Sequence, residues 1–449
     1  MNAPPFNGSI RDQRLAHLRA HERETREHIL RLFPQEKIAV RKWRDTLPVG
    51  LVLGGPRGGT SAFKAALARH PDCLALSGEH RIFFTLKGLN FPDGSAEDEC
   101  ADVALSEQQA TEILEMLFAS AFAGPEAADP SHEEALRYAW DWAYRLPMQW
   151  TGLDFDTREI VALVLAAVET YRGLGTGKLE TLDRLVLDAL AAAHPAIDPR
   201  FYDLPDGERP DGGWQAVRDR AFQPIIEITP FVIPRPRRLK MPEQTPKLLL
   251  LKASSDPFRI ATLRSLFAPR PVHVLRLTRN PLASINGLVD GWAHHCFWQH
   301  NLEKELGYDH PYAGWCFDLF PGWRDTAGAM DLPQLCAEQW IEPNRRLEEA
   351  ERTAPPNEHW TSYRFEEFIR SPQDRAQLLL RASTSLGLES SPALEAAART
   401  PPKVNVTAPS AAARWRKREA QLLPLLDRSA LSGLAARLGY DREKLDEWI

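Results

Sequence analysis

The sequence predicts an α/β fold, in which a parallel sheet is flanked by helices and the chain carries a large, mostly helical insertion. Short apolar runs bounded by Gly or Pro, at 51–53, 248–251 and 272–277, are typical of buried parallel strands. Helical patterns with start signals follow these runs, as expected where strands alternate with helices. Residues of about 100–245 show mainly helical patterns, and we interpret them as the insertion.

The first strand leads into a glycine-rich turn and then into a helix. Gly54–Gly59 follow the apolar run Leu51–Leu53 directly. Phe63 and Leu67 then share one helical face, and Pro71 ends the helix. The sequence therefore predicts a strand-turn-helix unit in which the turn is rich in glycine.

Start signals for helices recur in the rest of the chain. Asp256-Pro257, Asn280-Pro281 and Ser371-Pro372 each place a capping residue before a proline at the first helical position. A capping box at Ser106–Gln109 starts the first helix of the insertion. The run Trp360–Phe365 predicts one more strand.

The N-terminal segment has a different character from the rest. Residues 11–33 form a heavily charged helical stretch with few apolar positions, which favours a surface extension. We therefore expect a helical extension over 1–47 and a single domain over 48–449 that contains the insertion.

Composition excludes several classes of protein. The chain has 449 residues, 43% of them hydrophobic, with 55 Lys and Arg against 61 Asp and Glu and a net charge of −6. This content supports a large core and excludes disorder and a small disulfide-stapled fold. The mildly acidic balance argues against a nucleic-acid partner.

Cysteine spacing and the lack of long apolar stretches indicate the compartment of the protein. The five cysteines are scattered without a CxxC pair, the N-terminus has no apolar signal region, and no stretch reaches the ~20 apolar residues of a membrane helix. We expect a soluble, cytoplasmic, bacterial protein without a membrane span. The sequence is silent on its oligomeric state.

The glycine-rich turn is a candidate anion site. Backbone N–H groups of such a turn and the dipole of the following helix both favour a bound phosphate. Gly54 and Gly59 have the Walker A spacing, so the fold is P-loop-like, but Thr60 stands where the Walker lysine belongs. This change disfavours a kinase or NTPase, which stays open as an alternative beside a non-catalytic nucleotide-binding protein.

Residues 55–61 (Gly-Pro-Arg-Gly-Gly-Thr-Ser) resemble the 5′-phosphosulfate loop of sulfotransferases that use 3′-phosphoadenosine 5′-phosphosulfate (PAPS). The resemblance implies that PAPS is the co-substrate and that a basic residue at Arg57 stabilises the departing oxygen. The residues implied in this contact are Arg57, Gly58, Gly59, Thr60 and Ser61.

A second segment carries the resemblance further. Residues 70–79, followed by Phe83 and Phe84, are similar to the segment after that loop in heparan glucosaminyl 3-O-sulfotransferases, with one extra residue before the Phe pair. Glu79 falls on their catalytic glutamate and is our preferred general base. His80 is the rival, because histidine is the base in other sulfotransferase branches and titrates near neutral pH.

The 3′-phosphate of PAPS has its own candidate residues. Arg279-Asn280-Pro281 resembles the start of the family's 3′-phosphate site, where a cation and a helix N-terminus suit a phosphate dianion. The family places a serine eight residues after this arginine, but this chain has Gly287, and Ser284 on the same helix face is a candidate substitute.

Three weaker features complete the comparison with the family. Tyr363–Phe368 resembles a family segment in which Phe365 replaces a tyrosine. Residues 414–417 are similar to a C-terminal segment that covers the cofactor, which implies roles for Arg416 and Lys417. Lys252 follows a predicted strand at a position where bacterial members often carry a lysine facing the site, and a solvated lysine is the alternative.

The resemblance implies transfer of a sulfuryl group from PAPS to a hydroxyl, or as a second choice an amine, of a small-molecule, sugar or lipid acceptor. A sulfuryl group carries less charge than a phosphoryl group, so we expect no required metal. His294, His295, His300 and Cys296 lack the further ligands of a zinc site. The acceptor itself cannot be read from the sequence.

Overall fold

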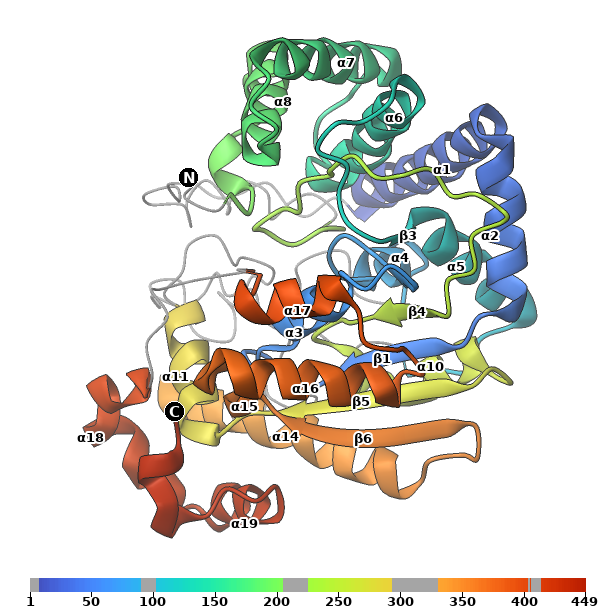
Figure 1. Ribbon diagram of the computed structural model, residues 1–449. Coiled ribbons are helices and arrows are strands. Elements are labelled where there is room, and N and C mark those ends of the chain that lie inside the picture. Colours follow the sequence, from blue (N-terminus) through green and yellow to red (C-terminus); the bar gives the residue numbers. More distant parts are fainter. Residues whose placement is uncertain (1–7, 90–101, 205–224, 293–329, 403, 405–412) are drawn as a thin grey trace.

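A six-stranded sheet forms the centre of the computed structural model, which describes residues 8–89, 102–204, 225–292, 330–402, 404 and 413–449 (Figure 1). The strand order is β3-β2-β4-β1-β5-β6. All neighbouring strands are parallel except for the antiparallel pair of β2 and β3. The strands are β1 Val49–Leu53, β2 Cys73–Ala75, β3 Phe122–Ala123, β4 Leu248–Leu251, β5 Val272–Thr278 and β6 Glu358–Arg364. The predicted α/β fold with a mostly parallel sheet is confirmed.

Helices cover the sheet and extend beyond it. The α-helices are α1 Gly8–Leu32, α2 Pro34–Thr46, α3 Thr60–Leu67, α4 Arg81–Leu86, α5 Glu107–Ser120, α6 His132–Gln149, α7 Thr157–Leu174, α8 Leu179–Ala193, α10 Ile260–Phe267, α11 Pro281–Trp292, α14 Leu332–Arg352, α15 Phe365–Arg370, α16 Pro372–Ser385, α17 Pro392–Arg399, α18 Glu419–Leu422 and α19 Ser429–Arg437. Short 3₁₀ helices are η1 Pro199–Phe201, η2 Asp256–Phe258, η3 Arg414–Arg418, η4 Leu423–Asp427 and η5 Arg442–Glu447. None of the helices in the described ranges has the length and apolar character needed to cross a membrane.

The central strand β1 is buried on both faces, which explains its continuous apolar pattern. Leu51 and Leu53 belong to a cluster that includes residues of α1, α2, α4, α5 and α10. Val52 points to the other face and belongs to a cluster with α3, α15, α16 and α17. Successive side chains of a strand alternate between faces, so one short strand anchors both layers of helices.

Two strands were not predicted. β2 and β3 are three and two residues long, which is too short to give a periodic pattern. The predicted strand at 272–277 extends to Thr278, and the predicted strand at 360–365 is observed as Glu358–Arg364. Asp256 starts the 3₁₀ helix η2, and α10 begins only at Ile260.

The N-terminal helix α1 packs one face against the core and exposes the other. Leu18 and Ile29 are buried in the same cluster as the sheet residues. The buried face of α1 also includes polar side chains. Glu22 is 3% exposed, and its carboxylate accepts hydrogen bonds from Arg26 and from the hydroxyl of Tyr144 on α6.

The region predicted as a helical insertion contains α5, α6, α7 and α8, together with the short strand β3. Helices α6, α7 and α8 pack around a cluster of their own, to which Trp142 and Leu146 contribute. Tyr144 and Met148 of the same helix α6 belong to the cluster of the sheet. Helix α6 therefore joins the two cores. Figure 1 shows α6 beside α7 and α8 at the top of the molecule.

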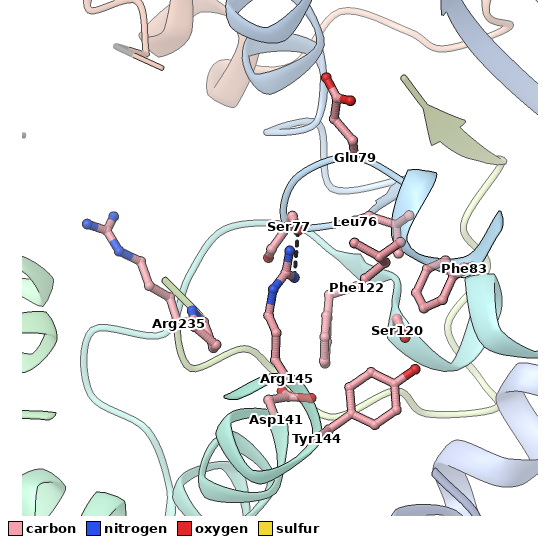
Figure 2. A pocket seen from close by; sticks show the side chains of 12 residues that line it. Leu76, Ser77, Glu79, Phe83, Ser120, Phe122, Asp141, Tyr144, Arg145 and Arg235 are labelled. Carbon is pink, nitrogen blue, oxygen red and sulfur yellow. Dashed lines mark hydrogen bonds between the residues drawn. The ribbon is translucent and has the colours of Figure 1, made fainter. Parts of the chain in front are cut away.

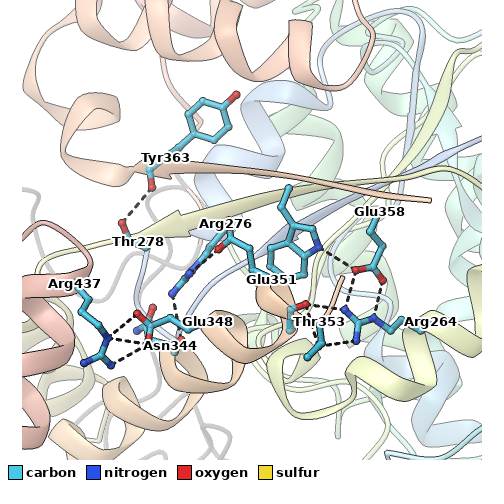
Figure 3. A network of polar contacts seen from close by, with 12 residues as sticks. Arg264, Arg276, Thr278, Asn344, Glu348, Glu351, Thr353, Glu358, Tyr363 and Arg437 are labelled. Atoms are coloured by element: carbon cyan, nitrogen blue, oxygen red, sulfur yellow. Dashed lines mark hydrogen bonds and ion pairs between the residues drawn. The ribbon is translucent and has the colours of Figure 1, made fainter. Parts of the chain in front are cut away.

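Polar contacts join α10 and α14 to the neighbouring strands β5 and β6 (Figure 3). Arg264 of α10 makes two bonds of 2.9 and 3.0 Å to the carboxylate of Glu358 at the start of β6. It also donates to the carbonyl of Ala350 on α14. Arg276 of β5 donates to Glu351 of α14 at 2.9 Å. These contacts fix the edge strand β6 and its neighbour β5, which lies next to β1.

Candidate active site

The glycine-rich turn between β1 and α3 has a backbone that only a few residues can adopt. Gly59 has a φ of +87° and Arg57 a φ of +58°, a region that favours glycine. The Gly58 amide donates to the Gly55 carbonyl at 3.1 Å, which closes the turn. A Cβ atom on Gly59 would lie 2.3 Å from the ring of Phe365. The turn therefore directs the first N–H groups of α3, which have no partner within the helix, toward the carboxyl edge of the sheet.

Sheet topology places two further strand ends beside this turn. Strand β1 pairs with β4 on one side and with β5 on the other. Lys252 directly follows β4, and Arg279 directly follows β5. Because parallel strands end at the same edge, both cations flank the turn.

Arg57 and Arg279 meet at the β5 side of the turn. The Arg279 guanidinium donates to the Arg57 carbonyl at 3.1 Å and lies 5.2 Å from the centre of the Phe365 ring. Burial lowers the pKa of Arg279 from its ordinary value. The side chain of Arg57 packs against Gly287 of α11, where an added Cβ atom would be 3.2 Å from the Arg57 Cβ. Gly287 stands where the sequence resemblance would place a serine, and it provides room for Arg57.

Lys252, Ser61 and Glu79 form a cluster on the β4 side. The Lys252 ammonium donates to the Ser61 hydroxyl at 3.1 Å and makes a close ion pair with the Glu79 carboxylate. The Ser254 amide donates to the other Glu79 oxygen at 3.3 Å. Lys252 is 6% exposed. Lys252 is therefore not a solvated lysine, and its part in a functional site stays a prediction.

This cluster keeps Glu79 ionised. Burial alone would raise the pKa of Glu79, but the Lys252 charge, its hydrogen bond and the Ser254 amide together hold the pKa below its ordinary value. An ionised carboxylate can accept a proton, as a general base must.

His80 lies in the interior, next to Glu79 in sequence. The imidazole is 1% exposed and its Nε2 atom is 3.0 Å from Asp256 Oδ1. Its ring also packs edge-on against Phe84 at 5.3 Å. The structure does not bring His80 to the open side of the turn, where Glu79 faces Lys252.

Helix α11 begins at the end of β5 with an ordered cap. The side chain of Asn280 accepts a hydrogen bond from the Ala283 amide at 2.8 Å and donates to Glu366 at 2.9 Å. Ser284, one turn into α11, is 1% exposed, and its hydroxyl has no hydrogen-bond partner among the described residues. The Nε atom of Arg279 is likewise buried without a described partner. These two orphaned groups beside a helix N-terminus fit a bound phosphate.

Arg416 and Lys417 are not brought to this site. Both are exposed, and Arg416 pairs with Asp446 at 2.8 Å. The arginines that contact α11 are Arg414, which pairs closely with Asp290, and Arg418, which reaches the same carboxylate at 2.7 Å. The sequence offers four basic residues in this five-residue 3₁₀ helix, and only the packing of η3 decides which ones face α11.

A buried lysine close to the turn was not predicted from the sequence. Lys64 of α3 is 7% exposed, and its ammonium donates to the carbonyls of Leu76 and Gly78. Burial lowers the pKa of Lys64 to about 8. A signal was present, because Lys64 is the one charged residue of α3, whose other members are apolar or hydroxyl-bearing.

A pocket lies beneath the segment that carries Glu79 (Figure 2). Phe83, Phe122 and Tyr144 contribute aromatic surface, while Asp141 and Arg145 contribute charge. Figure 2 shows Glu79 at the edge of this pocket with its carboxylate directed away from Tyr144 and Asp141. In the part of the chain that the structure describes, no group of three or more His, Cys, Asp or Glu side chains is arranged to hold a metal ion. His294, His295, Cys296 and His300 lie outside the described residues.

Comparison with known proteins gives matches among solved structures alone, since no protein-family model and no curated protein matches. The sulfotransferase domain from the curacin biosynthetic pathway is 12% identical with a TM-score of 0.38, over 88% of this chain and 99% of its own. The sulfotransferase from Alicyclobacillus acidocaldarius is 14% identical with a TM-score of 0.33, over 89% and 98%. Sulfotransferase STF9 from Mycobacterium avium is 13% identical with a TM-score of 0.32, over 95% and 86%. The chain is thus similar in structure to bacterial sulfotransferases over most of its length, at low identity.

The turn provides a test of the structure. We expect Gly59→Ala to destabilise the protein by about 3 kcal/mol, because it combines a strained φ with a clash against Phe365. Gly124→Ala is the matched control, since Gly124 has a φ of +74° but no atom within 4 Å of an added Cβ. It should cost only about 1 kcal/mol. Urea denaturation measures both, and equal losses would contradict the packing of Phe365 on the turn.

Proposed function

We propose that this protein transfers a sulfuryl group from PAPS to an acceptor hydroxyl, with an amine as second choice. The observation that carries the proposal is the convergence of the α3 N-terminus, Arg57 and Arg279 with the Lys252–Glu79 pair at one edge of the sheet. A phosphate cradle and a single ionised carboxylate then lie on the two sides of the same turn. The donor would bind at the cradle, and the acceptor would approach from Glu79.

The donor binds with its 5′-phosphosulfate over the turn. The N–H groups at the start of α3 and the Ser61 hydroxyl donate to its oxygens, and Lys252 supplies positive charge next to Ser61. We propose that the positive charges of Lys252 and Arg57 take the place that Mg²⁺ has in phosphoryl transfer. The proposed reaction therefore uses no metal.

Transfer is an in-line displacement at sulfur. The acceptor oxygen forms a bond to sulfur while the bond between sulfur and the oxygen of the 5′-phosphate breaks. Glu79 takes the acceptor proton, and 3′-phosphoadenosine 5′-phosphate (PAP) leaves with the electron pair. Arg57 stabilises the negative charge that develops on the departing oxygen.

Glu79 suits the role of base better than His80. Its carboxylate is held ionised beside the cradle by Lys252 and Ser254. His80 is enclosed and hydrogen-bonded to Asp256, so it anchors the segment from the inside.

The 3′-phosphate binds at the start of α11. Arg279 and the unpartnered hydroxyl of Ser284 are its direct contacts. Arg414 is the candidate for the part that the sequence predicts for Arg416 and Lys417, because it pairs with Asp290 of α11.

Ligand-induced thermal stabilisation tests the donor assignment. We expect PAP to raise the melting temperature by several degrees, since a ligand at 100 times its Kd stabilises the folded state by about 2.7 kcal/mol. ATP with Mg²⁺ should give no shift. A shift with ATP and Mg²⁺ alone would favour a kinase or NTPase, and a PAP shift without turnover on phenol, alcohol, sugar and amine acceptors would favour a binding protein.

Replacement of the two candidate bases separates their roles. We expect Glu79→Gln to lower kcat about 100-fold or more, as loss of a general base does, while the PAP-induced shift is kept. His80→Gln preserves a hydrogen-bonding nitrogen toward Asp256 and should change kcat by less than about tenfold. Full turnover by the Glu79 variant would remove this residue from the mechanism.

The Lys252–Glu79 pair predicts a pH effect. In Lys252→Met the burial of Glu79 remains but the opposing charge is gone, so its pKa rises and a higher pH is needed to ionise it. The acidic limb of the kcat/KM profile should therefore move to higher pH. Lys247→Met, at the exposed start of the same strand, is the control and should leave the limb in place. An unmoved limb in Lys252→Met would contradict the pairing.

A further inference from the structure

The segment that carries Glu79 is held by cations from outside it. We call this segment, residues 76–80, the base loop. The three backbone carbonyls that precede Glu79 all accept hydrogen bonds from buried or nearly buried cations. Lys64 donates to the carbonyls of Leu76 and Gly78, and Arg145 donates to that of Ser77 at 2.8 Å. Figure 2 shows the Arg145 guanidinium directed at Ser77.

Arg145 reaches the base loop from helix α6, in the region predicted as the insertion. Its Nε atom donates to Glu227 at 2.7 Å, and the side chain is 13% exposed. Glu227 is itself fixed, because it accepts hydrogen bonds from the Val232 amide at 2.9 Å and from Gln149 at 3.3 Å. The guanidinium is therefore aimed by a buried network, and its NH1 group is directed to the base loop.

Lys64 reaches the same loop from helix α3. It belongs to α3, whose first turn is the proposed phosphate cradle. One ammonium thus ties the base loop to the helix that binds the donor. The two anchors set the position of Glu79 against both the cradle and helix α6.

Glu79 and His80 at the end of the base loop are held by Lys252 and Asp256, and Lys64 and Arg145 hold the backbone that precedes them. Gly78 has a φ of +93° and no side chain, and an added Cβ atom would lie 2.7 Å from Val232 and 3.1 Å from an Arg145 nitrogen. Backbone carbonyls in such a turn need donors from elsewhere. Charged donors form the stronger hydrogen bonds.

We propose that Arg145 and Lys64 are positioning residues which hold the carbonyls of residues 76–78 so that Glu79 faces the phosphate cradle. This inference rests on the proposed function for its effect on turnover. It gives helix α6 a part in the catalytic geometry, in addition to any contact with the acceptor.

The test compares Arg145→Met, Arg145→Lys and a matched control. Arg172→Met is the control, because Arg172 also belongs to this helical region and also donates to a backbone carbonyl, that of Pro130 at 2.6 Å, while pairing with a glutamate. Should Arg145→Met not fold because Glu227 is left as a buried charge, the double variant Arg145→Met/Glu227→Gln replaces it.

Two readouts are measured. Hydrogen exchange of a peptide spanning 76–80 reports the order of the base loop in the free protein. Steady-state kinetics with PAPS, and with p-nitrophenol as the probe acceptor, report kcat and the KM for PAPS. We expect Arg145→Met to raise exchange about tenfold and to lower kcat about 10- to 100-fold with the KM for PAPS within twofold, as misplacement of a catalytic group does. Arg145→Lys should restore most of the slow exchange and most of kcat. Arg172→Met should match the wild type in both measurements.

The outcomes separate the two proposals. Wild-type exchange and kcat in Arg145→Met, or equal effects in Arg172→Met, would overturn the positioning role. A rise in the KM for PAPS that parallels the loss of kcat would also overturn it, because general damage weakens donor binding too. If the wild type neither binds PAP nor turns over PAPS, the proposed function fails, and exchange in the free protein still decides whether Arg145 holds the loop.

Discussion

The ion pair between Lys252 and Glu79 joins the parts of the candidate site. Lys252 comes from the end of β4, Glu79 from the segment after β2, and Ser61, the third partner, from α3. The Lys252 side chain is 7% exposed and the Glu79 side chain 28%, so removal of the carboxylate would leave a buried ammonium without its counter-charge. Two adjacent parallel strands must end together for this pair to form, and the register of β2 on β4, with Ala75 opposite Leu250, provides that.

The parallel order of β4, β1 and β5 explains why distant motifs meet. In sequence, 191 positions separate Ser61, which follows the glycine-rich turn, from Lys252, yet the turn and Lys252 follow adjacent strands. Arg279 arrives from the other neighbour in the same way. The cations are therefore distributed over three strand ends rather than clustered in one segment, which is consistent with a chain of net negative charge that still forms a cationic site.

The sequence predicted those parts of the site that depend on local pattern. The strand-turn-helix unit around Gly54–Gly59 and the helix start at Asn280 follow from residue types alone. The strand order does not, because periodicity says which residues form strands but not which strands are neighbours. Lys64 was missed because a lysine in a short helix is ordinarily solvated, and its burial depends on carbonyls of a segment twelve and more residues away.

Phe365 shows a second limit of pattern reasoning. The sequence comparison presented it as a tyrosine that lost a hydroxyl. In the structure its ring covers Gly59 and lies under Arg279, so the aromatic surface itself is in use. The role of this residue could be recognised only once the start of α15 was seen in contact with the turn.

Gly287 and Arg57 share one space between α11 and the turn, so the size of one limits the size of the other. The space that a larger residue would occupy on α11 is filled by the aliphatic part of the Arg57 side chain from the turn. A change at one of these positions therefore alters the steric demand at the other. Among chains that share this fold, we would look for the two positions to vary as a pair, with small residues on the helix accompanying long basic residues in the turn.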